Sequence, residues 1–228
     1  MSLFWLTGSS SAAAARWATR RQKRGTAALA TLAYFGVAGI EAGYLFCGGP
    51  GKRSLWSELL DELDLRGDEQ VLDVGCGRGA VLMLAAGRLP RGRAVGADIW
   101  RRIDQTGNSP SAAMRNAIAE GVSDRVEVVD ADARYLPFPS SSFDLVVSNL
   151  AIHNIRDADE RRQALSEAVR VLRPTRRLRV VDDKAHLYAA VLRDEGCTEL
   201  AVRRLDWRTS FGIPGHHLTL VEATTPTP

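Results

Sequence analysis

Apolar and polar positions between residues 53 and 224 follow two alternating patterns. In the first, Leu55, Leu59 and Leu63 recur every four residues, which predicts an amphipathic helix over 53–65. In the second, a short apolar run is bounded by turn residues, which predicts a strand. Strand-type runs occupy 70–75, 93–100, 125–132, 143–152, 176–183, 198–207 and 216–224, and further helical stretches occupy 80–89, 107–121, 157–172 and 184–196.

Strands that alternate with helices predict a doubly wound α/β fold, in which a mostly parallel sheet carries helices on both faces. The last two strands are separated only by the loop "RTSFGIPG" at 208–215. A connection this short suits an antiparallel pair and excludes a parallel crossover. We therefore predict a seven-stranded sheet whose last strand is antiparallel, preceded by a helical N-terminal extension.

The glycine-rich segment "VLDVGCGRGA" at 71–80 stands where the first predicted strand passes into a helix. Glycine loses more backbone entropy than other residues when it is ordered, so Gly75, Gly77 and Gly79 indicate positive φ angles or a place where a Cβ would not fit. A ligand that lies against the backbone creates this requirement. The segment is therefore a candidate ligand-binding loop.

Polar side chains end the next three predicted strands, at Asp98, Asp132 and Asn149. Ligands of doubly wound sheets bind at the carboxyl ends of the strands, so these side chains and the glycine loop should meet there. The loop has the spacing GxGxG, not the dinucleotide spacing GxGxxG, and Asp73 precedes it where its charge would repel a pyrophosphate. Three carboxylates at one edge predict a nucleoside that carries positive charge.

These motifs resemble the class I S-adenosylmethionine-dependent methyltransferases, in the small-molecule branch that includes the ubiquinone/menaquinone C-methyltransferases. The resemblance covers residues 53–223: "VLDVGCGRG" is similar to the family's first motif, "GADIW" to its second, and "DADARYLPFPSSSFDLVVSNLAIHNI" to its third and fourth. It implies a Rossmann-like fold, S-adenosyl-L-methionine as cofactor, and methyl transfer to a small-molecule acceptor, with lipophilic acceptors included. The cofactor-binding residues that it implies are Asp73, Gly75, Cys76, Gly77, Gly79, Asp98, Ile99, Asp132, Ala133, Ser148, Asn149 and Leu150.

The resemblance also implies a role for each part of the site. The glycine loop would run beside the methionine moiety, and Asp73 would support the loop or the amino group. Asp98 would hold the ribose hydroxyls, and Asp132 with Ala133 would bind the adenine. The segment from Ser148 to Leu150 would line the face on which the methyl group is transferred, and Ile99 would lie against the adenine.

Two departures from the family pattern bear on the function: one favours an alternative, and the other argues against a class of partner. The turn that commonly reads Pro-Gly-Gly is Pro174-Thr175-Arg176 here, which favours a non-catalytic scaffold that keeps the fold. An Asn-Pro-Pro-Tyr box is replaced by "SNLA", so we expect no nucleic-acid partner. A nicotinamide-dependent oxidoreductase is a second alternative, which the GxGxG spacing and the lack of a Tyr-x-x-x-Lys pair disfavour.

Histidine and cysteine positions suggest one catalytic candidate. His153 follows the fourth predicted strand and could deprotonate or orient the acceptor, or it could cap the next helix. His216 and His217 head the last predicted strand, where neighbours point to opposite faces, so we expect no metal site from them. Cys76 has no partner base nearby in the sequence and is interpreted as a small filler of the turn. The expected acceptor pocket combines 40–60, the segment after Asn149 and the loop 208–215.

Composition adds a charge asymmetry. The net charge is +3, yet residues 1–53 hold seven basic residues and one acid, which leaves the rest slightly acidic. An acidic body offers nucleic acid no general attraction. The three cysteines are widely spaced and form no CxxC pair, which argues against disulfides or a zinc site and suits a reducing compartment.

The segment 26–47 is apolar and follows the basic run "RWATRRQKR". Its length suits a membrane span, but alanine and glycine dominate it, Glu41 lies well inside it, and the basic flank would place the following domain outside the cytosol. It therefore fits either an interface-lying helix or a helical or loose extension. We expect an extension at 1–52, a methyltransferase domain at 53–223, a polar tail at 224–228, and a cytoplasmic protein with peripheral membrane contact as an option.

Overall fold

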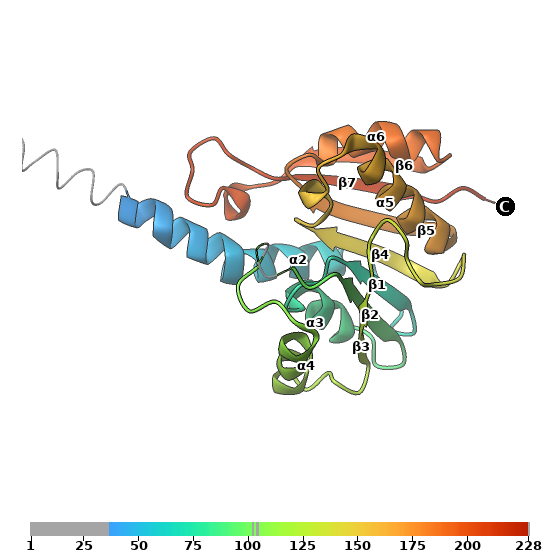
Figure 1. Cartoon of the computed structure of the whole chain (residues 1–228), viewed down its shortest axis with the longest axis horizontal. Coiled ribbons are helices and arrows are strands. Elements are labelled where there is room, and N and C mark those ends of the chain that lie inside the picture. The colour runs from blue at the N-terminus through green and yellow to red at the C-terminus, as the bar shows by residue number, and fades with distance from the viewer. Residues whose placement is uncertain (1–36, 102, 104, 228) are drawn as a thin grey trace, which may run out of the picture.

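The computed structural model describes residues 37–101, 103 and 105–227, so predictions for 1–36 lie outside the described residues. The first described element is a helix over 37–46, which projects from the body (Figure 1). The helices that follow are η1 (Cys47–Gly51), α2 (Lys52–Asp61), α3 (Ala80–Ala86), α4 (Pro110–Ala119), η2 (Ile152–Asn154), α5 (Ala158–Val171), α6 (Ala185–Asp194) and η3 (Trp207–Thr209). The strands are β1 (Gln70–Val74), β2 (Arg93–Asp98), β3 (Val126–Asp130), β4 (Phe143–Asn149), β5 (Leu172–Asp182), β6 (Thr198–Arg204) and β7 (Thr219–Thr224).

The strands form one sheet in the order β3-β2-β1-β4-β5-β7-β6. β1 to β5 pair in parallel, and β7 is antiparallel to both of its neighbours, β5 and β6. The predicted seven-stranded, mostly parallel sheet with an antiparallel last strand is therefore confirmed. Strand order reverses between β1 and β4, which places the topological switch point beside the glycine loop that follows β1.

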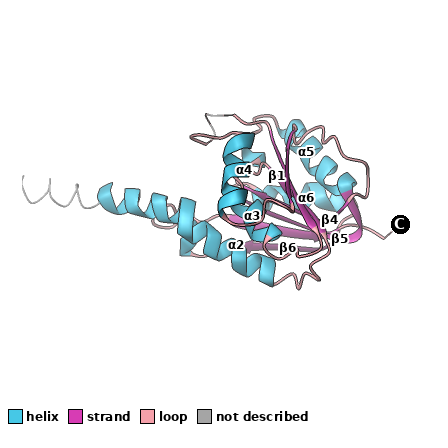
Figure 2. Ribbon diagram, turned by 90° about the horizontal axis from the view of Figure 1, so that it is seen from below, coloured by secondary structure: helices cyan, strands magenta, loops and turns pink. Residues whose placement is uncertain are grey.

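Helices cover both faces of the sheet, as Figure 2 shows. α2, α3 and α4 pack on one face, where Trp56, Leu60 and Leu82 are fully buried. α5 and α6 pack on the other, where Leu165 and Leu192 are fully buried. Each strand between them must present apolar side chains to both faces, which explains the short continuous apolar runs in the sequence.

Arg179 of β5 fastens α2 to its face of the sheet. The guanidinium is nearly fully buried; it donates to the carbonyl oxygen of Leu59 and lies 3.2 Å from a carboxylate oxygen of Glu62. On the sheet side it lies 2.5 Å from a carboxylate oxygen of Glu222 in β7. A buried guanidinium is stable only when such partners compensate its desolvation, so this contact fixes where α2 sits.

Several predicted boundaries move. β5 begins at Leu172, not at residue 176, and runs through the altered turn, where Thr175 has a φ of 59°. β3 ends at Asp130, so Asp132 lies in the loop beyond it. β7 begins at Thr219, which leaves His216 and His217 in the preceding loop and not on the strand. Tertiary pairing decides these ends, because Leu172 pairs with Phe143 of β4.

Part of the N-terminal extension can be described. Residues 37–46 are helical, and η1 joins them to α2. Within the described part of the chain, no helix is both long enough and apolar enough to cross a bilayer.

We predict that Arg179→Ala lowers the free energy of unfolding by about 2 kcal/mol, because it leaves the Glu222 carboxylate and the carbonyl oxygen of Leu59 without their buried partner. Guanidinium chloride denaturation measures the change. Arg203→Ala is the matched control, since Arg203 is half exposed and pairs with the same Glu62, 2.8 Å away. We expect a loss of about 0–1 kcal/mol there. Equal losses in the two variants would contradict the anchoring role of Arg179.

Candidate active site

The glycine loop turns the chain from β1 into α3 through positive φ angles at Gly75 (73°), Gly77 (55°) and Gly79 (84°). A Cβ on Gly75 would collide with the side chain of Ala151, which follows β4. The loop and the end of β4 are therefore closely packed, and glycine is required there for space as well as for conformation. Gly79 serves as the N-cap of α3.

Asp98, at the end of β2, holds the glycine loop. Its carboxylate accepts hydrogen bonds from the backbone N–H of Gly77 at 2.8 Å and of Trp100 at 2.6 Å. The side-chain amide of Asn108 donates a third bond at 3.2 Å. Gln105 lies on the other side of the loop, where its amide oxygen accepts from the N–H of Arg78. The acid predicted as a ribose ligand thus also organises the loop.

Asp73, on β1, is a deeply buried carboxyl group of the site. It is 2% exposed, and its Oδ2 has no hydrogen-bond partner among the described residues. Burial raises its pKa to about 7, and the Asp98 carboxylate adds to this, although the positive charge of Lys52 opposes it. The same burial lowers the pKa of Lys52, at the start of α2. A cation that reached Oδ2 would gain a strong partner.

Asp132 differs from the expectation that its carboxylate is free to face a ligand. It accepts hydrogen bonds from the backbone and the guanidinium of Arg134, with the shortest at 2.5 Å. That guanidinium also reaches Glu160 of α5 at 2.8 Å. Arg134 holds the pKa of Asp132 below its usual value. The carboxylate is thus part of a charge network that anchors the loop after β3.

The end of β4 is fixed by two internal hydrogen bonds. The hydroxyl of Ser148 is buried and donates to the carbonyl oxygen of Val74 at 2.8 Å. The side-chain oxygen of Asn149 accepts from the indole N–H of Trp56 at 2.7 Å, which ties β4 to α2. Leu150 follows with a φ of 53° and packs against the core under α2 and α3. These three predicted residues lie beside the glycine loop.

His153, in η2, forms a pair with a residue that the sequence reasoning missed. Its Nδ1 lies 3.0 Å from a carboxylate oxygen of Asp182, and its backbone N–H donates to the other oxygen at 3.1 Å. Asp182 ends β5 and is fully buried. Its carboxylate raises the pKa of His153. The rule that polar residues at strand ends gather at the carboxyl edge applies equally to Asp182 and would have found it.

Three other predicted residues occupy different environments. Cys76 is 8% exposed, and burial raises the pKa of its thiol far above the usual value, so it stays protonated. Ala133 packs against the core under α5 and α6. Ile99 is about half exposed. The thiol therefore serves as a small buried group, as the sequence analysis interpreted it.

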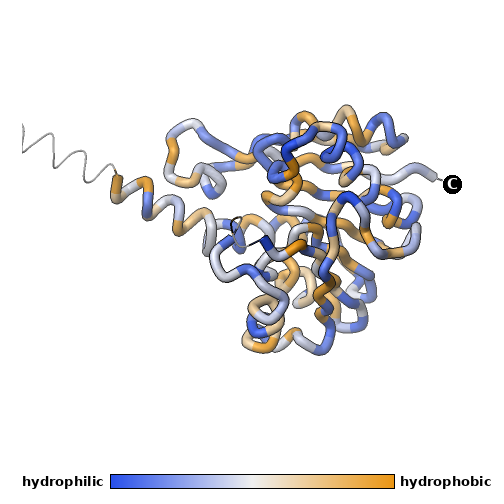
Figure 3. The backbone as a smooth tube through the Cα atoms, viewed as in Figure 1, coloured by the Kyte–Doolittle hydropathy of each residue, from blue (hydrophilic) through white to orange (hydrophobic). Residues whose placement is uncertain are grey.

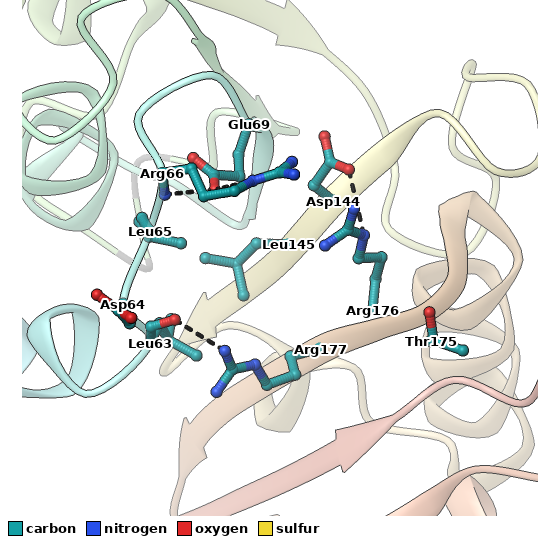
Figure 4. Close-up of a pocket in the computed structure, with 10 residues that line it drawn as sticks. All are labelled: Leu63, Asp64, Leu65, Arg66, Glu69, Asp144, Leu145, Thr175, Arg176 and Arg177. Atoms are coloured by element: carbon teal, nitrogen blue, oxygen red, sulfur yellow. Dashed lines mark hydrogen bonds and ion pairs between the residues drawn. The ribbon is translucent and has the colours of Figure 1, made fainter.

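A pocket at the opposite edge of the sheet is separate from this site (Figure 4). Several of its charged groups already have partners in the chain. Asp144 pairs with the guanidinium groups of Arg173 and Arg176, and Arg177 donates to the carbonyl oxygen of Leu63. It lies at the amino ends of β1 and β4, away from the glycine loop.

Comparison with known proteins identifies the domain. Residues 71–175 match the family model described as a methyltransferase domain. The ubiquinone/menaquinone biosynthesis C-methyltransferase UbiE of Hahella chejuensis is 38% identical over 136 residues, which make up 58% of this chain and 50% of that protein. The chain spans about half the length of the curated relatives that it matches.

Solved structures share the fold. The [4+2]-cyclase SpnF gives a TM-score of 0.63 at 20% identity, over 75% of this chain and 81% of that one. Geranyl diphosphate C-methyltransferase from Streptomyces coelicolor A3(2), solved with Mg²⁺, geranyl diphosphate and S-adenosyl-L-homocysteine, gives 0.59 at 17% identity, over 75% of this chain and 78% of that one. Identities this low show the fold alone.

The sheet order and the two helical layers form a Rossmann-like fold, which solved methyltransferase structures share. Residues 71–175 match a methyltransferase domain, and the chain is similar over 136 residues to a ubiquinone/menaquinone C-methyltransferase. The resemblance seen in the motifs is confirmed.

We predict that Asp73→Asn stabilises the protein in the absence of ligand. A carboxyl group whose native pKa is about 7 binds its proton more tightly when folded than when unfolded, so wild-type stability falls as the pH rises from about 4 to 7. At pH 8.5 the variant, which has no charge to bury, should be more stable by about 2 kcal/mol or more.

Guanidinium chloride denaturation between pH 5 and pH 8.5 tests this prediction, and the advantage of Asp73→Asn should shrink as the pH falls. Asp130→Asn is the control, because that carboxylate is exposed at the end of β3. A pH-independent difference between wild type and Asp73→Asn would contradict the burial of a carboxylate there.

Proposed function

We propose that the chain transfers a methyl group from S-adenosyl-L-methionine to a small-molecule acceptor. The observation that carries this proposal is the buried, unpartnered Oδ2 of Asp73 beside the positive-φ glycine loop of a methyltransferase domain. A methyl donor that carries an ammonium and a sulfonium group would provide the cationic partner that this carboxylate oxygen lacks.

The residues at the carboxyl edge fit such a donor. The glycine loop carries no side chains at Gly75, Gly77 and Gly79 and has positive φ angles there, so its backbone would be accessible to a methionine moiety. Asp98 would accept from the ribose hydroxyls, sharing or exchanging its bonds to Trp100 and Asn108. The backbone around Asp132 and Ala133 would receive the adenine, because the Asp132 carboxylate is held by Arg134.

The protein's task in this reaction is mainly alignment. The sulfonium of the donor is intrinsically reactive, so the chain must place the acceptor in line with the methyl group and exclude water. An acceptor that must lose a proton also needs a base. His153 could meet that need: its Nδ1 lies 3.0 Å from the Asp182 carboxylate, which would orient the ring, and Nε2 would take the proton.

The acceptor would bind between three segments that the fold brings together. Trp56 of α2 bonds to Asn149, and Arg208 in the loop after β6 donates to Ser54 and Glu58 of α2 at 3.0 and 2.6 Å. Aromatic side chains near this junction, Tyr44 and Phe211, favour a lipophilic acceptor.

We also propose the domain limits 53–223, with 1–52 as an extension and 224–228 as a tail. α2 lies outside the matched segment 71–175 but is tied to the sheet by Arg179. A cytoplasmic location is part of this proposal, because the methyl donor is a cytosolic cofactor.

We predict that calorimetry detects binding of S-adenosyl-L-homocysteine and no binding of NADH. Asp98→Ala should weaken that binding by at least about tenfold, since it removes the acceptor for the ribose and the anchor of the loop. Asp130→Ala is the control for loss of an acid at a neighbouring strand end, and circular dichroism verifies that both variants fold. A binding signal with NADH and none with S-adenosyl-L-homocysteine would contradict the proposal and favour an oxidoreductase.

The acceptor is best found by incubating the protein with methyl-labelled S-adenosyl-L-methionine and a cell extract, then identifying the labelled product. A donor that binds but yields no labelled product in any extract would favour the scaffold alternative.

We predict that kcat/KM for the identified acceptor rises with pH through a pKa above the usual value of His153, because only the neutral ring can take a proton. Asp182→Asn removes the negative charge that raises this pKa, so the rise should move to lower pH. His186→Ala, an exposed histidine of α6, is the control and should leave the profile unchanged. A profile that is identical in wild type and Asp182→Asn would exclude His153 as the base.

A further inference from the structure

The helix at 37–46 and the loop after β6 form one exposed apolar surface. Figure 1 shows both segments extending from the same end of the body, and Figure 3 shows apolar positions along the projecting helix. The large apolar residues that are at least 47% exposed there, called the apolar platform below, are Val37, Ile40, Tyr44, Leu45, Trp207 and Ile213.

The helix and the loop that form the apolar platform are packed against each other. A Cβ on Gly43 would collide with the backbone of Gly212, so helix and loop touch backbone to backbone. Phe46 stacks on Trp207 with ring centroids 5.3 Å apart, and Tyr44 lies 5.7 Å from Phe211. These contacts hold the apolar side chains of two distant sequence segments on one surface.

An exposed apolar surface of this kind marks a binding site for a protein or a membrane. The sequence just before the helix distinguishes the two. Residues 1–36 contain five basic residues and no acid, and residues 26–46 contain a single charge, Glu41. An apolar surface preceded by a basic segment complements a bilayer with anionic lipids, whereas two copies of the chain would bring like charges together.

We propose that the apolar platform docks this protein on the surface of an anionic lipid bilayer. Ile213 and Trp207 insert with the helix into the interface, and the basic residues at 16–24 add attraction to the lipid headgroups. This docking does not depend on methyl transfer.

Docking would place the acceptor edge of the domain next to the lipid. Phe211 lies 6.0 Å from the ring of His216, whose Nε2 lies 3.0 Å from a carboxylate oxygen of Asp183. Asp183 directly follows Asp182, the partner of His153. If the proposed function holds, docking implies that the acceptor is an amphiphile, which reaches His153 from the bilayer.

Cosedimentation of the full chain with vesicles tests the docking. Vesicles of phosphatidylcholine with one quarter phosphatidylglycerol are compared with pure phosphatidylcholine, with no methyl donor present. We expect binding to the anionic vesicles that falls with added salt. Ile213→Glu and Leu45→Glu should each lower the partition coefficient by about tenfold or more, since each places a charge where an apolar side chain would be buried.

Ile118→Glu is the matched control, because Ile118 is 65% exposed on α4, outside the platform, and should bind as wild type does. Thermal melts verify that all three variants fold. Three results would overturn the proposal: no binding to anionic vesicles, an equal effect of Ile118→Glu and Ile213→Glu, or a dimer in solution that Ile213→Glu dissociates. The proposed function is tested separately, by calorimetry with S-adenosyl-L-homocysteine and by methyl labelling, so failure of one proposal does not imply failure of the other.

Discussion

The desolvated carboxyl group of Asp73 is the constraint around which the carboxyl edge is organised. β1 lies at the centre of the sheet, so a side chain at its end is surrounded by the glycine loop, α2 and the neighbouring strands. A carboxylate there costs stability unless a cation approaches it, and Lys52 compensates only in part. The buried carboxylate thus lowers the stability of the free protein, as is common for residues of functional sites.

The other polar residues of the carboxyl edge mainly stabilise the positions of the surrounding segments. Asp98 secures the glycine loop, Asn149 secures α2, and Asp132 is joined through Arg134 to α5. The bonds of Asp98 and Asn149, and the contact of Arg134 with Glu160, connect segments that are far apart in sequence, so they hold the loops of this edge in place. Preorganisation of this kind suits a reaction in which alignment supplies most of the rate enhancement.

The fold alone does not fix the reaction. SpnF, a [4+2]-cyclase, has the same fold with a TM-score of 0.63, as does a geranyl diphosphate C-methyltransferase. The case for methyl transfer therefore depends on the glycine loop, Asp73 and Asp98, and on a family match that covers these residues. The proposed binding of the acceptor involves segments outside that match. They are the helix at 37–46 and the loop that carries Trp207 and Ile213.

The sequence by itself determined the seven strands, their antiparallel end and the residues of the carboxyl edge, because burial on both faces and tight turns leave local patterns of apolar residues and glycines. It could not determine that Asp182 lies beside His153, that Arg134 reaches Glu160 of α5, or that β5 begins at Leu172. Nor could it show that Gly43 packs on Gly212 to build the apolar platform. Those features are contacts between segments distant along the chain, and only the packed fold decides which of many compatible partners meet.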